Sequence, residues 1–424
     1  MNELSVLIKE DMRPALGVTE PGAIAFAVAK AKQYTEGEVL RVKVLLNSGM
    51  YKNAFTCGIP NSVRYGNLYA AALGAVAANA ELGLESLAEI TPQDDELAAK
   101  FVEEGKVGVQ MDHIGSEIMI EATVETSFDV CKVHIHGSHT NITSIVKNGD
   151  IIFEKKAEGG KNEFEKEILI HKYTVKELLE YVSEVPLEEI AFIRDAFKMN
   201  LELLDEGLAS ERAVIAKLLL AENANQIISE NVLKTAQLMC NGAIEARVLG
   251  LSRPAMSITG SGAHGIIATM PLYAFYKVMK MEDDEMLLRA TALSYLITMY
   301  IKEYSGKLSA FCGCGIAAGT GMACGLGFMH GANEEQITMI IQNMASGLTG
   351  MICDGGNHGC AMKGIVATDA AFRSVDFAMK NINISGIHGI NGLCAEDTMR
   401  HMGMIASPGM VETEKVIVNI MGNK

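Results

Sequence analysis

Cysteine is the residue type with the clearest chemical potential in this sequence, because five of its nine copies fall between residues 312 and 360. They are Cys312, Cys314, Cys324, Cys353 and Cys360. Thiolates are soft ligands that suit zinc or iron–sulfur clusters. A zinc ribbon would need paired C-x-x-C knuckles, and the C-G-C at 312–314 is too tight to be one. Spacing alone leaves buried free cysteines, a disulfide, a redox pair and metal ligands as alternatives.

Glycine is concentrated in the same part of the chain. The three glycine-rich stretches are SITGSGAHGIIATMP (257–271), LSAFCGCGIAAGTGMACG (308–325) and GMICDGGNHGCAMK (350–363). Glycine weakens helices, so its use here indicates close approach of the backbone to another helix or to a bound group. The first stretch lacks the lysine and preceding strand of a phosphate-binding loop and the βαβ context of a dinucleotide site, which argues against phosphate binding.

Charge and hydropathy narrow the class of protein. The 424 residues carry a formal charge of −16 without Lys/Arg clusters, so we expect neither nucleic acid nor a membrane surface as a partner. The N-terminal stretch has no apolar signal region, which predicts a reducing, cytoplasmic location and argues against a disulfide framework. The uncharged segment 308–329 is long enough for a membrane span, but its small residues favour a buried central helix. A homo-oligomer is left open.

Periodicity predicts an α+β fold with two domains. Helices are expected at 19–34, with Thr19 as N-cap, at 67–82 and at 93–105. Strands are expected at 38–47 and as four runs within 117–154. From Thr174 onward the pattern is almost only helical, and the charged stretch 154–167 reads as a linker. We therefore predict a mixed α/β N-terminal domain over 1–165 and an all-α domain over 166–424.

Several of these stretches together resemble the L-cysteine desulfidase family, relatives of the iron–sulfur L-serine dehydratase alpha chain. The similarity is carried by RPALGVTEPGAIAFA, HTNI at 139–142, RPAMSITGSGAHGIIATMP, LSAFCGCGIAAGTGMACG and SGLTGMICDGGNHGCAMK. The resemblance implies a [4Fe–4S] cluster in the helical domain, held by Cys312, Cys353 and Cys360. The remaining Cys314, Cys324 and Cys394 are then interpreted as packing residues.

A cluster with three protein ligands leaves one iron open to act as a Lewis acid on a substrate heteroatom. The resemblance thus implies a lyase that eliminates hydrogen sulfide or water from a small amino acid substrate, such as L-cysteine or L-serine, and yields pyruvate and ammonia. No pyridoxal phosphate is implied.

One departure from the family concerns the proton acceptor. Where the family usually has a cysteine before T-E-P, proposed as the base, this chain has Val18, whose isopropyl group takes no proton. Candidate replacements are Glu20, Cys57 and His264, although a carboxylate in the first turn of a helix has a lowered pKa and is a poor base. Val18 also keeps open another small hydroxy or thiol acid as substrate, or a cluster-binding protein without catalysis.

Substrate contacts are expected from the T-G-S-G loop and from two asparagines. The predicted contact residues are Thr259, Ser261, Gly262, Asn141 and Asn357, and the asparagines have a plain alternative as turn residues. His139 is interpreted as a turn or core histidine.

Overall fold

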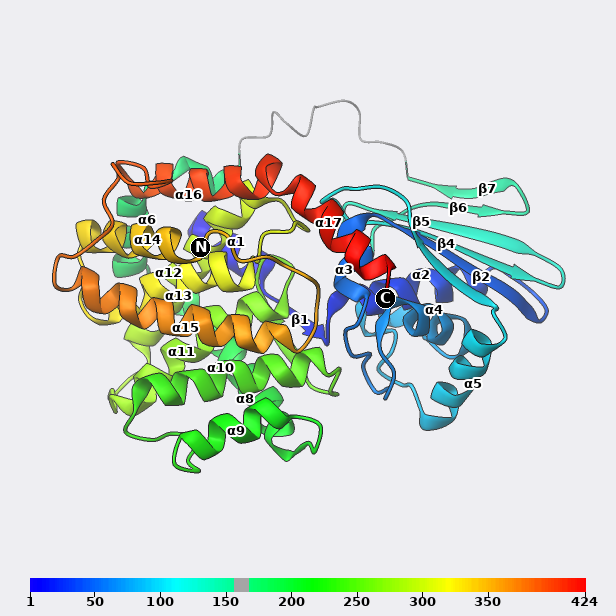
Figure 1. Ribbon diagram of the computed structural model, residues 1–424, viewed down its shortest axis with the longest axis horizontal. Coiled ribbons are helices and arrows are strands. Elements are labelled where there is room, and N and C mark those ends of the chain that lie inside the picture. Colours follow the sequence, from blue (N-terminus) through cyan, green and yellow to red (C-terminus); the bar gives the residue numbers. More distant parts are fainter. Residues whose placement is uncertain (156–167) are drawn as a thin grey trace.

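The computed structural model describes residues 1–155 and 168–424, which form a sheet lobe and a helical lobe (Figure 1). The sheet lobe contains β2 (Val39–Leu46), β3 (Val107–Met111), β4 (Met119–Thr126), β5 (Val130–His136), β6 (Ile142–Lys147) and β7 (Asp150–Glu154). They lie in the order β3-β2-β4-β5-β6-β7, and among the described strands only the β2–β3 pair is parallel. Residues 156–167 of the predicted linker lie outside the described part of the chain.

Helices cover one face of this sheet. The helix α2 (Thr19–Gln33) packs against the central strands β4 and β5, α4 (Gly66–Val76) packs against β2 and the edge strand β3, and α5 (Pro92–Glu103) packs on α4. Along β4 every second side chain is buried, as expected for a sheet with one face on a core and the other toward solvent. The short helix α3 (Ser48–Ala54) follows β2 directly and leads toward the helical lobe.

The helical lobe is built around α13 (Gly319–Met329), which contacts four surrounding helices and is almost entirely buried. The four neighbours are α11 (Gly262–Val278), α12 (Glu285–Ser305), α14 (Glu334–Leu348) and α15 (Gly359–Ala378). Helix α10 (Val232–Val248) is also mostly buried and packs on α11 and α15. The outer helices are α6 (Val175–Glu184), α7 (Leu187–Ile190), α8 (Arg194–Ala209), α9 (Val214–Glu222) and α16 (Ala395–Met404). Within the described residues, none of the helices has the length and apolar character needed to span a bilayer.

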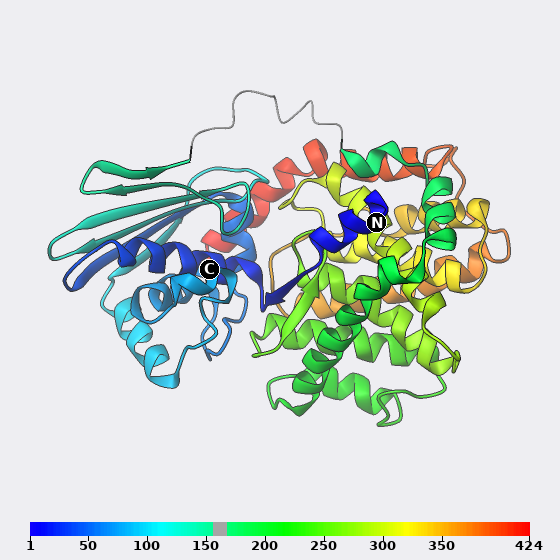
Figure 2. The same cartoon turned by 180° about the vertical axis from the view of Figure 1, so that it is seen from behind.

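Each end of the chain packs on the lobe formed by the other end. Helix α1 (Glu3–Asp11) lies on α12, and β1 (Arg13–Leu16) pairs antiparallel with β8 (Pro254–Ser257), so the N-terminal residues belong structurally to the helical lobe (Figure 2). At the other end α17 (Val411–Gly422) packs against α3 of the sheet lobe (Figure 1). The two lobes are therefore joined by crossed terminal segments.

A buried ion pair fixes the contact between α17 and α3. Lys52 Nζ lies 2.7 Å from Glu414 Oε2, and the two side chains are 0% and 5% exposed. Lys52 Nζ also donates a hydrogen bond of 2.8 Å to the carbonyl of Ser309, three residues before Cys312. One ammonium group thus links the sheet lobe, the C-terminal helix and the cysteine region.

Most predicted elements agree with the structure, with three local corrections. The helix predicted from Thr19 begins there, but Val18 occupies the N-cap position with extended backbone, and the Thr19 hydroxyl donates to Glu20 instead. The helix predicted over 67–82 ends at Val76 and is followed by a 3-10 turn, Ala80–Glu85. The strands β1, β3 and β8 were not predicted, because each is short and lacks a long alternating pattern.

Candidate functional site

A cavity of about 390 Å³ lies where the two lobes meet. Its walls come from the start of α2, the loop before α11, the end of α12 and both cysteine-rich segments. Val18 and Glu20 reach it from the sheet lobe, and Thr259 and Cys353 reach it from the helical lobe. The cavity gathers residues that are far apart in the sequence, which makes it the candidate active site.

The two cysteine-rich segments lie side by side at this cavity. Phe311 and Ile352 form an antiparallel bridge, the Cys312 amide donates 3.0 Å to the carbonyl of Met351, and the Cys353 amide donates 2.6 Å to that of Ala310. Side chains alternate between the faces of such a pair, so Cys312 and Cys353 point to the same face. The pairing explains how a separation of 41 residues in the sequence becomes proximity in the fold.

Four thiols gather at the site. Cys314, Cys353 and Cys360 line the cavity, while Cys312 stands 3.3 Å from Cys314, sulfur to sulfur. Burial raises the pKa of Cys360 to about 12, and the nearby Cys314 acts in the same direction. Cys314 therefore takes part in the wall of the site, which the packing interpretation did not include.

The remaining two cysteines of that interpretation differ from each other. Cys324 is buried inside α13, as a packing residue should be. Cys394 is exposed, and its sulfur accepts a hydrogen bond of 3.4 Å from the Asp397 amide at the start of α16. Cys394 is an N-cap residue, so its interpretation as a packing residue was wrong.

The donor set suits an iron–sulfur cluster better than a single metal ion. Among the described residues no group of three or more His, Cys, Asp or Glu side chains could hold one ion. A cubane is different, because each of its ligands binds a separate iron and the sulfurs must stand apart. Buried thiols around a cavity, with the ammonium groups of Lys302 and Lys363 close enough to act on their charge, fit such a group chemically.

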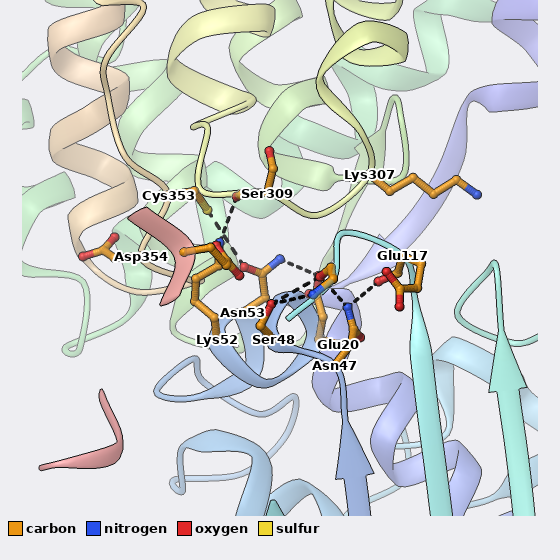
Figure 3. A network of polar contacts seen from close by, with 12 residues as sticks. Glu20, Asn47, Ser48, Lys52, Asn53, Glu117, Lys307, Ser309, Cys353 and Asp354 are labelled. Carbon is orange, nitrogen blue, oxygen red and sulfur yellow. Dashed lines mark hydrogen bonds and ion pairs between the residues drawn. The ribbon is translucent and has the colours of Figure 1, made fainter. Parts of the chain in front are cut away.

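Asn53, at the end of α3, connects the sheet lobe to the cysteines (Figure 3). Its side-chain amide donates a hydrogen bond of 2.9 Å to Glu20 Oε1, and its carbonyl oxygen lies 3.9 Å from Cys353 Sγ. Val18 also lies close to the loop that carries Cys353 and Cys360, since a β-carbon added at Gly356 would lie 2.9 Å from Val18 Cγ2. Val18 thus lies against the cysteine loop.

Glu20 is a buried carboxylate. Burial acts to raise its pKa, but the nearby His139, the hydrogen bond from Asn53 and the charge of Arg247 together lower the pKa to about 2. His139 Nε2 lies 3.9 Å from Glu20 Oε1, whereas the side-chain amide of Asn53 lies at 2.9 Å from the same oxygen. Glu20 is consequently an anion at neutral pH and a weak base, as its place in the first turn of α2 predicts.

The lowered pKa of Glu20 predicts a pH-dependent contribution to stability. Because the folded pKa is about 2 and the ordinary value is 4.5, the carboxylate stabilises the folded state above pH 4.5, and this contribution disappears as the pH falls toward 2. The Glu20→Gln variant should lose about 3 kcal/mol of unfolding free energy at pH 7. Urea unfolding at pH 7 and pH 3 checks this, because the difference from wild type should shrink by more than half. The exposed Glu10→Gln serves as control, and an undiminished difference at pH 3 would contradict the assignment.

His264 lies in the first turn of α11, at the cavity wall. Its Nδ1 is 2.6 Å from Thr259 Oγ1, and that hydroxyl donates a hydrogen bond of 2.8 Å to the Ile258 carbonyl. The hydroxyl hydrogen is therefore in use, so Nδ1 carries the imidazole proton and Nε2 has the free lone pair. Burial, with the charges of Lys302 and Arg247, holds the pKa of His264 well below its usual range, which keeps the ring neutral.

The T-G-S-G loop is held in position by the N-terminal segment. The Thr259 amide donates to the Asp11 carboxylate, and Thr259 and Gly260 have φ values of 50° and 73°. A β-branched residue with positive φ is uncommon and marks a backbone held by its surroundings. Thr259 and Ser261 line the cavity, and Gly262 follows them as the first residue of α11.

Three predicted site residues stand elsewhere. Asn141 is at the turn before β6, where it donates to the His136 carbonyl and accepts from Lys155. Asn357 folds the cysteine loop on itself by accepting from the Gly359 amide, and neither asparagine belongs to the described cavity wall. Cys57 is fully buried behind that wall, and burial raises its pKa well above the usual value, which disfavours it as a base.

Of the charged residues in the cavity wall that the sequence analysis did not identify, two are buried cations. Arg247 near the end of α10 and Lys302 near the end of α12 line the cavity and are 5% and 7% exposed. Burial lowers the pKa of Lys302 to about 8. The sequence did contain a signal for both residues, because each is a cation on a helix whose other residues are mostly apolar or small. Lysine and arginine are rarely buried unless they are paired.

The chain is similar to known proteins over most of its length. The family model described as serine dehydratase alpha chain matches residues 62–419. A "UPF0597 protein" of Clostridium botulinum is 41% identical over 420 residues, which cover 98% of this chain and 97% of that protein. Proteins of the same description from Clostridioides difficile and Caldanaerobacter subterraneus are 34% and 36% identical, with 98% and 99% of this chain covered.

Proposed function

The chain belongs to the serine dehydratase alpha chain family, and from that premise we propose that it is an iron–sulfur-dependent lyase. Its reaction would eliminate water or hydrogen sulfide from a small β-substituted amino acid such as L-serine or L-cysteine. The observation that carries the proposal is the meeting of buried thiols, a neutral histidine and the T-G-S-G loop around one cavity. Family membership by itself indicates a dehydratase-like activity, and the substrate and the cluster are the proposed part.

Cys312, Cys353 and Cys360 would hold a [4Fe–4S] cluster, with Cys314 beside them as a fourth thiol. When bound, the cluster supplies an electron-accepting iron that favours departure of the hydroxyl or thiol group from Cβ. The residues of the chain bind the substrate, exclude water and move the proton. Lys302, whose ammonium group donates 2.7 Å to the Gly306 carbonyl, adds positive charge at the cavity wall beside the thiols.

His264 is the proposed general base. Its Nε2 faces the loop before α13, since a β-carbon at Gly313 would lie 2.6 Å from that atom. The free lone pair can accept the Cα proton while the bond from Cβ to the leaving group breaks, which gives an aminoacrylate. Hydrolysis of the aminoacrylate then yields pyruvate and ammonia. His264 lines the cavity, unlike Cys57, and its neutral ring offers a lone pair to a proton. Its lowered pKa makes it a weaker base than an exposed histidine, as the lowered pKa of Glu20 does for that carboxylate.

Replacement of His264 tests this role. The His264→Gln variant keeps a hydrogen-bonding side chain but removes the basic nitrogen, so turnover should fall on the order of 100- to 10,000-fold. Protein purified and reconstituted without oxygen is assayed for pyruvate from L-serine and for pyruvate and sulfide from L-cysteine. Iron and acid-labile sulfide should stay at the wild-type level. The exposed His388→Gln is the matched control.

The opposite result would place the base at the family's position. If His264→Gln retains full turnover while Val18→Cys raises that of the wild type, the proton acceptor belongs beside Gly356. Val18→Cys exchanges two apolar side chains of similar volume and should change stability little. No pyruvate or sulfide from either substrate, in a protein that carries a full cluster, would contradict the proposed reaction.

Val18 supports a second candidate, a divergent member of the family. Such a protein would act on another small hydroxy or thiol acid, or would keep the cluster without catalysis. The same anaerobic preparation decides between them. A wild type that is inactive on serine and cysteine but converts a β-hydroxy acid would favour the altered substrate, and full cluster occupancy with no turnover would favour the non-catalytic role.

A further inference from the structure

Arg247 is a buried cation that forms no salt bridge with any residue in the described part of the chain. Its side chain lines the cavity and is 5% exposed, and its Nε has no hydrogen-bond partner among the described residues. Glu20 is close enough for its pKa to respond to Arg247, yet its oxygens already accept from Asn53 and Thr19. A buried guanidinium in this state is costly unless a ligand completes its hydrogen bonds.

The guanidinium stands at the N-terminus of a long helix. A β-carbon added at Gly262, the first residue of α11, would lie 2.7 Å from Arg247 Nε, so only glycine lets the two approach. The N-cap residue Ser261 makes no side-chain cap hydrogen bond. The first amides of this 17-residue helix therefore remain open to a ligand, and the helix dipole adds positive potential there.

We propose that Arg247 and the first turn of α11 form the subsite for the carboxylate of the substrate. A guanidinium presents paired donors that match the two oxygens of a carboxylate, and helix N-termini bind anions through their backbone amides. The subsite is a binding assignment that rests on the proposed function for its substrate class, a small α-amino or α-hydroxy acid. Arg247 would contact the substrate directly.

The subsite also orients the substrate. His264 belongs to the same first turn of α11, and the thiols of Cys353 and Cys360 line another part of the same cavity. A carboxylate fixed at Arg247 leaves Cα within the reach of a side chain on that turn, while Cβ extends toward the thiols. Specificity for an acid over its amide or ester then comes from one positive subsite that a neutral group cannot satisfy.

The test measures binding of L-alanine, which has the same carboxylate but no leaving group at Cβ, so it is not consumed. Isothermal titration of the reconstituted protein compares L-alanine with L-alaninamide, which lacks the carboxylate. For the wild type the amide should bind about 10- to 100-fold more weakly, and for Arg247→Met the affinity for L-alanine should fall by a similar factor. Arg247→Lys should show an intermediate affinity, because it keeps the charge but loses the paired donors.

Arg64→Met is the matched control, because Arg64 Nε also lacks a partner in the described residues but lies over the Tyr69 ring, outside the cavity wall. Equal binding of L-alanine and L-alaninamide by the wild type, or no binding of L-alanine, would overturn the subsite. So would an Arg247→Met variant that binds L-alanine with unchanged affinity. If that variant does not fold, the wild-type comparison of acid and amide decides alone. Binding that depends on Arg247 in a protein inactive on serine and cysteine would refute the proposed reaction and keep the subsite.

Discussion

Serine in place of Cys353 or Cys360 should abolish the cluster and lower lyase turnover by on the order of 100-fold or more. Removing a residue that only hydrogen-bonds to a metal ligand usually costs less than this. Both thiols line the cavity, and an alcohol is a much poorer ligand for iron than a thiolate. The reconstituted variants should lose the broad visible absorbance together with iron and acid-labile sulfide.

Three further cysteine variants make this expectation more specific. The exposed Cys394→Ser should keep the full cluster, because Cys394 caps α16. Comparison of Cys312→Ser with Cys314→Ser tests the assignment of Cys312 as the third ligand, since the two sulfurs are 3.3 Å apart. Loss of the cluster in Cys312→Ser and its retention in Cys314→Ser are expected. Full iron and sulfide in Cys353→Ser and Cys360→Ser would refute the ligand assignment.

The second large effect concerns stability. Glu414→Ala should lower the free energy of unfolding by about 3–5 kcal/mol, because it leaves the Lys52 ammonium buried without its counter-ion. The Ser309 carbonyl, 2.8 Å from Lys52 Nζ, is a dipole and replaces only part of that charge. Chemical denaturation of the variant and the wild type measures the loss. The dependence of the unfolding free energy on denaturant concentration should have the same slope in both proteins.

The matched control is Glu412→Ala, which removes a carboxylate paired with Lys415 on the surface of the same helix. An exposed pair of this kind contributes at most about 1 kcal/mol. The double variant Lys52→Met/Glu414→Leu should recover most of the stability lost in Glu414→Ala, since two apolar groups need no compensation. Equal losses for Glu412→Ala and Glu414→Ala would show that the helix, and not the charge, is responsible.

Local patterns in the sequence predicted the elements but not the contacts between distant ones. The alternation of β4 and the alanine-rich run of α2 are visible within a dozen residues, and the structure confirms both. The bond from the Thr259 amide to Asp11 joins residues 248 apart. Neither local sequence indicates its distant partner. The pairing of β1 with β8 was missed for the same reason.

Some residues of the candidate site were predicted from the sequence and others were not, for the same reason. Cys353, His264 and Ser261 were found because their glycine-rich stretches are conspicuous in the sequence. Arg247 was not, because a cation on a mostly apolar helix was overlooked, and its lack of a hydrogen-bond partner at Nε is visible only in the fold. Asn141 has the polarity of a contact residue, but the turn before β6 uses its hydrogen bonds.

The crossed termini also set the order in which the molecule can be completed during synthesis. Val18 and Glu20 leave the ribosome early, but β1 has no partner until Pro254–Ser257 has been made, and Lys52 has no counter-ion until Glu414 follows. Domains generally fold as units from the N-terminus as translation proceeds, whereas contacts of such long separation have to wait. The nascent chain therefore cannot complete the cavity wall before Cys360 is made, and a product truncated before α17 lacks the buried ion pair that joins the two lobes.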